Sequence, residues 1–134
     1  MPRNAYLANA KRSPVGSFGG SLKPMRATEV ATQVGKALLA DGGIAPDDVD
    51  LVIGGMVLQD MTESNPARIL SLNLGIPDKV AAYTVNMQCC SSMAALIQAA
   101  QAVALEEADV VLVAGMESMS NAPHMVPGSR WGHR

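Results

Sequence analysis

The sequence predicts an α/β fold with a mainly parallel sheet, and three observations support this. Short apolar runs of strand length alternate with longer segments that have a helical pattern of apolar residues. Gly and Pro residues mark the ends of these segments. Residues 90–107 form a helical segment that is apolar almost all round. Hydrophobic residues make up 49% of the 134 residues, which suffices for one domain with its own core.

The first elements follow this alternation. The apolar run Ala5–Ala10 is expected to be the first strand, and Arg12–Gly20 is expected to be a loop. A helix is expected from about Thr28, whose hydroxyl suits an N-cap position. Gly42–Gly43 is expected to end that helix, because Gly readily adopts the left-handed conformation of a helix C-terminus.

The middle of the chain repeats the pattern. Val49–Met56 is expected to be the second strand. Asn65-Pro66 predicts the start of a helix, since a capping residue is followed by Pro at the first helical position. Gly75 and Pro77 are expected to end the helix, and Val80–Val85 is expected to be the third strand.

The last predicted helix indicates how the domain must be covered. It is expected over about Cys90–Glu107, followed by a fourth strand at Asp109–Ala114 with Gly115 at its carboxyl end. A helix without a polar stripe needs cover on every side, and a lone two-layer domain would leave one face bare. The sequence therefore predicts that a second layer from elsewhere covers this helix.

Cys89 is the candidate nucleophile. It lies at the seam between the third strand and the helix that begins near residue 90. The unpaired N–H groups and the positive end of the helix dipole favour thiolate over thiol at such a position. The same N–H groups can hold the oxyanion that forms when a thiolate attacks a carbonyl. The alternative from position alone is a buried, inert cysteine.

Four segments, in order, resemble the thiolase family. Residues 85–89 (VNMQC) are similar to the segment that carries the acyl-accepting cysteine, and residues 113–123 (VAGMESMSNAP) to the strand end and loop that follow it. Residues 12–16 (RSPVG) and 64–68 (SNPAR) resemble two further family segments. Together the four matches span nearly the whole chain.

The resemblance implies a layered α/β fold in which two similar halves stack, with the nucleophile helix of each half between the two sheets. Residues 1–134 would be most of the first, N-terminal half, and residues 121–134 would begin the loop region that covers the substrate. The C-terminal half is absent from this sequence and would come from the same chain or a second chain.

The resemblance also implies a homodimer or tetramer. In relatives the strand that corresponds to residues 80–85 pairs with its twin across a two-fold axis. Three residues near the start of the preceding helix are expected to shape the contact between subunits: Asn65, Pro66 and Arg68.

The implied activity is acyl transfer through Cys89. The reaction would be thiolytic cleavage of a 3-ketoacyl-CoA, or Claisen condensation of two acetyl-CoA to acetoacetyl-CoA, through an acyl-cysteine intermediate. Coenzyme A thioesters would be substrates rather than bound cofactors, and fatty acid metabolism would be the setting. A histidine must activate the thiol, and neither His124 nor His133 matches the family's histidine motif. Ser118 and Met119 are expected near the pocket, mainly as packing residues.

Two other functions stay open. Half a thiolase could serve as a non-catalytic scaffold or assembly subunit, although retention of Cys89 with its flanking residues argues against this. A ketoacyl-synthase-type condensing enzyme is suggested by Ser92, which stands where thiolases usually have Gly.

Composition and charge exclude several classes. A formal charge of −2 without a Lys or Arg cluster predicts neither nucleic acid nor an anionic membrane as a partner. No secretory signal is expected, and the uncharged stretch at 80–105 is expected to be a buried helix rather than a membrane span.

Cys90 cannot form an unstrained bridge to its neighbour and is expected to be a small filler in the helix. No metal site is predicted, and a reducing, cytoplasmic compartment is favoured.

Overall fold

The computed structural model describes residues 3–59 and 61–132. Its sheet contains three parallel strands in the order β2-β1-β3. The strands are β1 (Leu51–Gly55), β2 (Ala81–Val85) and β3 (Val111–Gly115), and the helices are α1 (Ala27–Gly42), α2 (Pro66–Asn73) and α3 (Ser91–Ala104). The predicted α/β class with a parallel sheet is therefore confirmed.

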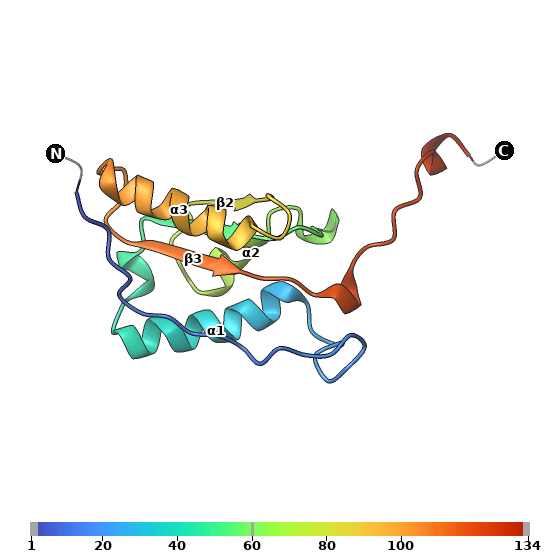
Figure 1. Cartoon of the computed structure of the whole chain (residues 1–134), viewed down its shortest axis with the longest axis horizontal. Coiled ribbons are helices and arrows are strands. Elements are labelled where there is room, and N and C mark those ends of the chain that lie inside the picture. Colours follow the sequence, from blue (N-terminus) through green and yellow to red (C-terminus); the bar gives the residue numbers. More distant parts are fainter. Residues whose placement is uncertain (1–2, 60, 133–134) are drawn as a thin grey trace.

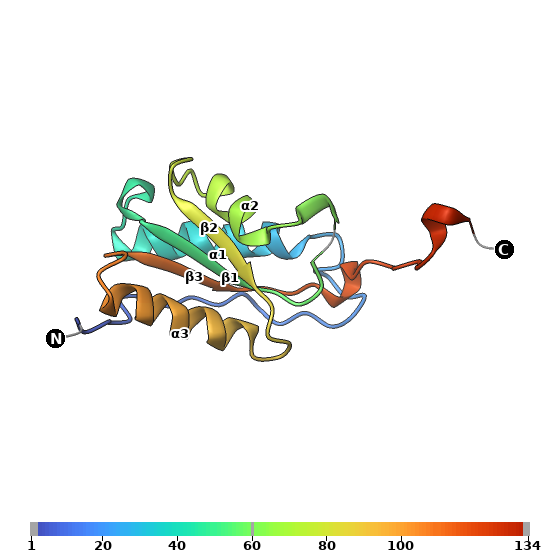
Figure 2. The same cartoon turned by 90° about the horizontal axis from the view of Figure 1, so that it is seen from above.

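The sheet is the middle of three layers. Figure 2 shows α1 and α2 on one face of the sheet and α3 on the other. Successive β1 residues serve the two faces, as the alternation of a strand requires. Val52 packs in a cluster with Leu70 and other residues of the α1 and α2 side, whereas Ile53 packs with Ala95 and Ala99 of α3. These five buried residues lie within the two separate halves of the core.

Most of the predicted ends of α1 and α2 are observed in the structure. Asn65 caps α2 by accepting the N–H of Arg68 at 3.3 Å, and Pro66 is the first helical residue. Gly43 follows α1 with φ 60°, the left-handed conformation that Gly adopts without steric cost. Gly75 takes up φ 75° just after α2. The turn residues of the sequence thus place these ends correctly.

The N-cap prediction for α1 is wrong. The cap is Arg26, whose backbone N–H donates to the Glu29 carboxylate at 2.7 Å, and α1 begins at Ala27. Thr28 lies inside the first turn, is buried, and donates its hydroxyl to Glu63 at 2.7 Å. The local pattern predicted that the Thr28 hydroxyl would cap the helix, but this hydroxyl bonds to a residue distant in sequence.

The expected first strand at Ala5–Ala10 is also wrong. Arg3 donates its N–H to the carbonyl of Ala104, and Asn9 donates its amide to the carbonyl of Leu38 at 2.9 Å. The polar contacts of this extended segment thus go to the ends of α3 and α1 (Figure 1), and it joins no strand ladder. Tyr6, exposed by 84%, lies open on the surface.

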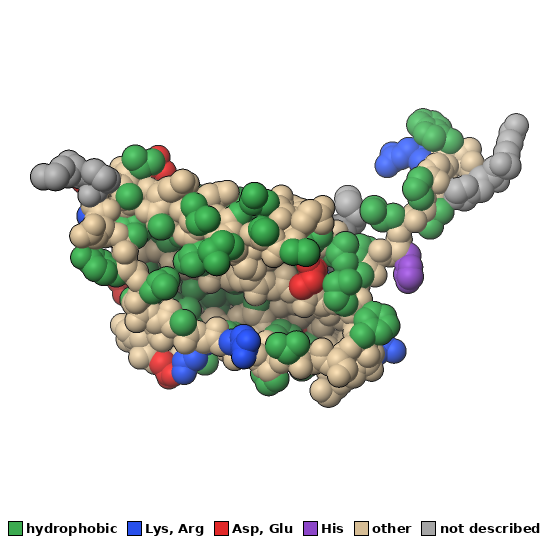
Figure 3. All heavy atoms as spheres, viewed as in Figure 1, with side chains coloured by type: hydrophobic (Ala, Val, Ile, Leu, Met, Phe, Trp, Pro, Cys, Tyr) green, Lys and Arg blue, Asp and Glu red, His purple; other side chains and the backbone are tan. Residues whose placement is uncertain are grey.

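The outer face of α3 is exposed in this chain, as its apolar sequence predicts when no second layer covers it. Met93, Ile97 and Leu105 are each more than half exposed, at 59%, 51% and 68%. On the face shown in Figure 3, on which α3 and β3 lie, hydrophobic side chains are more numerous than charged ones. Among the described residues, no helix is long and apolar enough to cross a membrane. Beyond residue 121 the chain runs away from the three layers as an extended arm (Figure 1).

Candidate active site

Cys89 lies in the turn that joins the carboxyl end of β2 to the first turn of α3. β2 ends at Val85 and α3 begins at Ser91, so the thiol stands at the carboxyl edge of the parallel sheet. Cys89 is exposed and forms no disulfide. The position is the one where α/β folds collect their catalytic groups.

The turn before Cys89 is held in an uncommon conformation. Gln88 has φ 52°, a left-handed value that a residue with a side chain rarely adopts. Its N–H donates to the Asn86 side-chain oxygen at 3.1 Å, and its carbonyl accepts the Ser91 hydroxyl at 2.6 Å. Ser91 also accepts the N–H of Met87 at 2.9 Å. Local strain held by several bonds is typical of turns that present a functional side chain.

Two glycines let the start of α3 approach the sheet. A Cβ on Gly55 would lie 2.6 Å from the backbone of Ser91 and Ser92, closer than real Cβ contacts. A Cβ on Gly115 would lie 2.7 Å from the Ser92 Cβ. Gly55 and Gly115 pair across β1 and β3, so together they form the surface on which the amino end of α3 rests.

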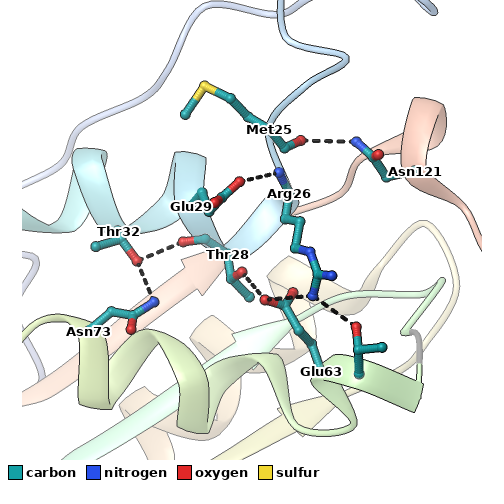
Figure 4. A network of polar contacts seen from close by, with 9 residues as sticks. Met25, Arg26, Thr28, Glu29, Thr32, Glu63, Asn73 and Asn121 are labelled. Carbon is teal, nitrogen blue, oxygen red and sulfur yellow. Dashed lines mark hydrogen bonds and ion pairs between the residues drawn. The ribbon is translucent and has the colours of Figure 1, made fainter.

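A polar network also links the loops that follow β1 and β3. Asn121 donates to the carbonyls of Lys23 and Met25, each at 3.0 Å, and Figure 4 shows the bond to Met25. Arg26 forms an ion pair with Glu63 at 3.6 Å. Loops that begin at neighbouring strand ends are thereby joined through the amino end of α1.

Comparison with known proteins gives the family. The family model described as "Thiolase, N-terminal domain" matches residues 5–134. The chain belongs to the thiolase family. It is 45% identical over 134 residues to an acetyl-CoA acetyltransferase of Allochromatium vinosum, covering all of this chain and 34% of that relative.

Solved thiolase structures share the fold. The acetyl-CoA acetyltransferase of Bacillus anthracis superposes with a TM-score of 0.95 at 40% identity, over 99% of this chain and 34% of that one. The Acat5 thiolase of Ascaris suum, in complex with coenzyme A, superposes with a TM-score of 0.90 at 33% identity, over 94% and 33%. The chain thus spans about a third of the length of the relatives that it matches.

The thiolase residues predicted around Cys89 have mixed outcomes. Cys90 is the N-cap residue of α3 and is exposed, so its expected role as a small filler one step into the helix is wrong in this chain. The helix begins one residue later than expected, which leaves Cys90 outside the packed turn. Ser92 is exposed in the first turn of α3 and faces Gly115.

The loop beyond β3 lies at the carboxyl edge, as predicted for Ser118 and Met119. Ser118 is half-buried and its hydroxyl accepts the Asn121 amide at 2.9 Å. Met119 is 57% exposed, so it packs less than the sequence suggests. His124 is exposed on the arm, and His133 lies outside the described residues.

Asn65, Pro66 and Arg68 fasten α2 to the edge strand β2 of the thiolase sheet. The Asn65 amide donates to the carbonyl of Ala82 at 3.0 Å, and Arg68 donates to the carbonyl of Val80 at 3.0 Å. Pro66 is buried. The expected subunit contact through these residues stays a prediction, and their observed partners belong to the same chain.

One carboxyl group has a pKa that the fold lowers. Asp50 accepts the N–H groups of Val110 and Asp109, each at 2.9 Å, and these two hydrogen bonds lower the pKa of Asp50 below its usual value. Asp50 precedes β1, at the edge of the sheet opposite Cys89, so its role is structural. The described residues contain no group of His, Cys, Asp and Glu that could hold a metal ion.

Sequence reasoning missed two features of this turn, the Asn86 side chain and the conformation of Gln88. Asn86 carried a signal, because an amide directly after a strand and three residues before a nucleophile is well placed to brace the turn. No feature of the sequence indicated the conformation of Gln88, since its residue type gives no sign of a left-handed φ.

Proposed function

We propose that this chain supplies the nucleophile half of a thiolase that transfers acyl groups between coenzyme A thioesters through Cys89. The observation that carries the proposal is the exposed Cys89 at the start of α3, within the N-terminal domain of a thiolase. The names of the relatives, acetyl-CoA acetyltransferase and a thiolase in complex with coenzyme A, support the substrate class.

In the degradative direction, the Cys89 thiolate attacks the keto carbon of a 3-ketoacyl-CoA. The bond between the keto carbon and the neighbouring carbon breaks, and the electron pair leaves on acetyl-CoA, which takes a proton. The acyl group remains on sulfur as a thioester. The thiol of a second coenzyme A then attacks this thioester, which releases acyl-CoA and restores the cysteine. Condensation of two acetyl-CoA is the reverse reaction.

The chain's own groups supply part of this chemistry. The N–H groups of Cys90 and Ser91 donate to the carbonyls of Met87 and Gln88. We therefore assign the oxyanion contact to the N–H of Cys89 itself. His124 lies on the exposed arm and has no assigned role, so the catalytic histidine would come from the C-terminal half. We call residues 1–134 together with that half, from the same chain or a second one, the assembled enzyme.

The bare face of α3 supports the need for that second half. Met93, Ile97 and Leu105 present an apolar surface that a stacked α/β half would cover. Residues 121–134 would contribute to the substrate cover, and β2 would pair with its twin in a homodimer or tetramer. Two exposed thiols fit a reducing, cytoplasmic setting, and fatty acid metabolism is the proposed context.

The two alternative functions have weaker support. A non-catalytic scaffold would not need an exposed cysteine in a braced turn. A ketoacyl-synthase-type enzyme rests on Ser92 alone, and the relatives carry acetyltransferase and thiolase names.

The test is to trap the acyl-enzyme. Limiting iodoacetamide on the assembled enzyme, followed by peptide mapping, is expected to label Cys89 before Cys90. Acetyl-CoA is expected to leave an acetyl group on Cys89. The Cys89→Ser variant should lose the acyl-enzyme, because a hydroxyl of nearly the same size does not readily form an anion. Cys90→Ser is the matched control and should retain it. Earlier labelling of Cys90, or acylation of Cys89→Ser, would contradict the assignment.

A further inference from the structure

We propose that Glu117 is a positioning residue that fixes the nucleophile turn through a relay of three hydrogen bonds. The relay runs from the Glu117 carboxylate through the peptide groups of Val57 and the side chain of Asn86 to the N–H of Gln88. Gln88 directly precedes Cys89, so the relay ends on the backbone that carries the thiol. The inference rests on the proposed function, because it gives the relay a reaction to serve.

The first bond joins the loops after β3 and β1. Val57 and Glu117 each lie two residues beyond Gly55 and Gly115, which pair in the sheet. The Val57 N–H donates to a Glu117 carboxylate oxygen at 2.9 Å, and the neighbouring Leu58 N–H lies 3.4 Å from the same carboxylate. A carboxylate is an acceptor only, so it can take both N–H groups, and bonds to a charged acceptor are stronger than neutral ones.

The second bond joins the loop after β1 to the end of β2. The Asn86 amide donates to the Val57 carbonyl at 3.1 Å. Both polar groups of residue 57 are therefore held, the N–H by Glu117 and the carbonyl by Asn86. The segment between the two strand ends cannot shift without breaking one of these bonds.

The third bond reaches the strained residue. The Asn86 side-chain oxygen accepts the Gln88 N–H at 3.1 Å. The Val57 carbonyl needs a donor and the Gln88 N–H needs an acceptor, so the two partners allow only one orientation of the Asn86 amide. Gln88 stays at φ 52° while Asn86 and the Ser91 hydroxyl hold its two backbone groups. Without the Glu117 end, Val57 and Asn86 gain freedom, and Gln88 can relax toward a negative φ that redirects Cys89.

Glu117 acts through other groups, and no described contact places it on the thiol. Its carboxylate is exposed on this chain and accepts the backbone N–H groups of Val57 and Leu58. The expected consequence of removing it is misplacement of the nucleophile, which lowers the acylation rate while the fold remains. Misplacement of a reacting group by about 1 Å costs up to about a hundredfold in rate.

The experiment uses the assembled enzyme with Glu117→Ala, Glu117→Gln and, as a control, Glu107→Ala. Glu107 is likewise an exposed carboxylate, at the far end of α3. Two quantities are measured: the rate of Cys89 acetylation by acetyl-CoA, and the hydrogen exchange rate of the Gln88 amide. Glu117→Ala should slow acetylation at least about tenfold. It should also speed Gln88 exchange about three- to tenfold, the factor that one net hydrogen bond supplies. Glu117→Gln keeps an oxygen for Val57 and should restore most of both, and Glu107→Ala should change neither.

A second variant tests the relay itself. Asn86→Asp can still accept the Gln88 N–H but cannot donate to Val57, so it cuts the relay at its middle bond. In the Asn86→Asp background, Glu117→Ala should have no further effect on either quantity. If Glu117→Ala does not fold, Asn86→Asp alone decides the question: loss of the middle bond should slow Cys89 acetylation and speed Gln88 exchange, and unchanged values of both would overturn the proposal.

Several results would overturn the proposal. Unchanged acetylation and Gln88 exchange in Glu117→Ala would show that the relay carries nothing. Equal losses in Glu117→Ala and Glu117→Gln, with unchanged Gln88 exchange, would assign the effect to charge. Additive effects of Asn86→Asp and Glu117→Ala would show two independent contributions. A wild-type enzyme that is not acetylated would refute the proposed function, and Gln88 exchange would still decide the relay.

Discussion

Gly115 and Ser92 form a pair whose energetic coupling can be predicted from the geometry. A Cβ added to Gly115 would lie 2.7 Å from the Ser92 Cβ and closer still to the Ser92 hydroxyl oxygen. Rotation of the Ser92 side chain moves the hydroxyl away but leaves its Cβ in place. The helix or the strand end must therefore shift, and overpacking of this kind costs about 1–3 kcal/mol of the free energy of unfolding.

Removing the Ser92 side chain relieves the clash. With Gly at position 92, the nearest atom of that residue to the new Cβ is its Cα at 3.9 Å, an ordinary contact. The double variant Gly115→Ala with Ser92→Gly should therefore recover most of the loss. Ser92→Gly alone is expected to cost no more than about 1 kcal/mol, the usual penalty of Gly in a helix. The coupling free energy between the two substitutions should be about 1–3 kcal/mol.

The assay is the free energy of unfolding of the assembled enzyme, from urea denaturation of the wild type, both single variants and the double variant. Gly55→Ala is the matched control: its Cβ would lie 2.6 Å from the backbone atoms of Ser91 and Ser92, which Ser92→Gly does not remove. It should destabilise the enzyme equally in both backgrounds. Additive effects of Gly115→Ala and Ser92→Gly would refute the reasoning, as would rescue of Gly55→Ala by Ser92→Gly.

Two further predictions concern the bare helix and the acid stability. Residues 1–134 expressed alone should bind dyes specific for apolar surface and self-associate, because side chains such as Met93 and Ile97 lie open on α3 and burial of each is worth about 1.5–3 kcal/mol; a monodisperse monomer that melts cooperatively would contradict this. The lowered pKa of Asp50 stabilises the fold above the carboxyl's unfolded pKa of about 3.9, and this contribution is lost as the pH falls through the folded pKa. In urea denaturation of the assembled enzyme from pH 6 to pH 3, Asp50→Asn should therefore lose less stability than the wild type, and parallel curves would rule out the assignment.

The sequence predicts most elements because its turn residues act locally. Asn65-Pro66 and Gly43 determine helix ends through bonds and φ values that involve only their neighbours. The two wrong predictions of secondary structure, a strand at Ala5–Ala10 and an N-cap at Thr28, have a common cause. In both cases contacts with residues distant in sequence decide the outcome: Asn9 bonds to Leu38, and Thr28 bonds to Glu63.

The residues of the candidate site also differ in whether local sequence predicts them. Cys89 could be predicted because a nucleophile between a strand and a helix is recognisable from consecutive residues. The groups that brace it could not, since Val57, Asn86 and Glu117 meet only when three parallel strands end at one edge. The register that pairs Gly55 with both Val85 and Gly115 brings these residues together, and no spacing in the sequence encodes that register.

The strand register also relates the side chain at position 92 to the placement of Cys89. α3 rests on Gly55 and Gly115, and the turn that carries Cys89 is the last segment before this contact. A side chain at position 92 therefore affects how deeply the helix seats on the strand ends, whether or not its hydroxyl meets the substrate. Because Gly115 has no side chain, it leaves room for Ser92 beside the strand end. Ser92 is then a packing feature of the nucleophile helix, and it gives little weight to a synthase-type reaction.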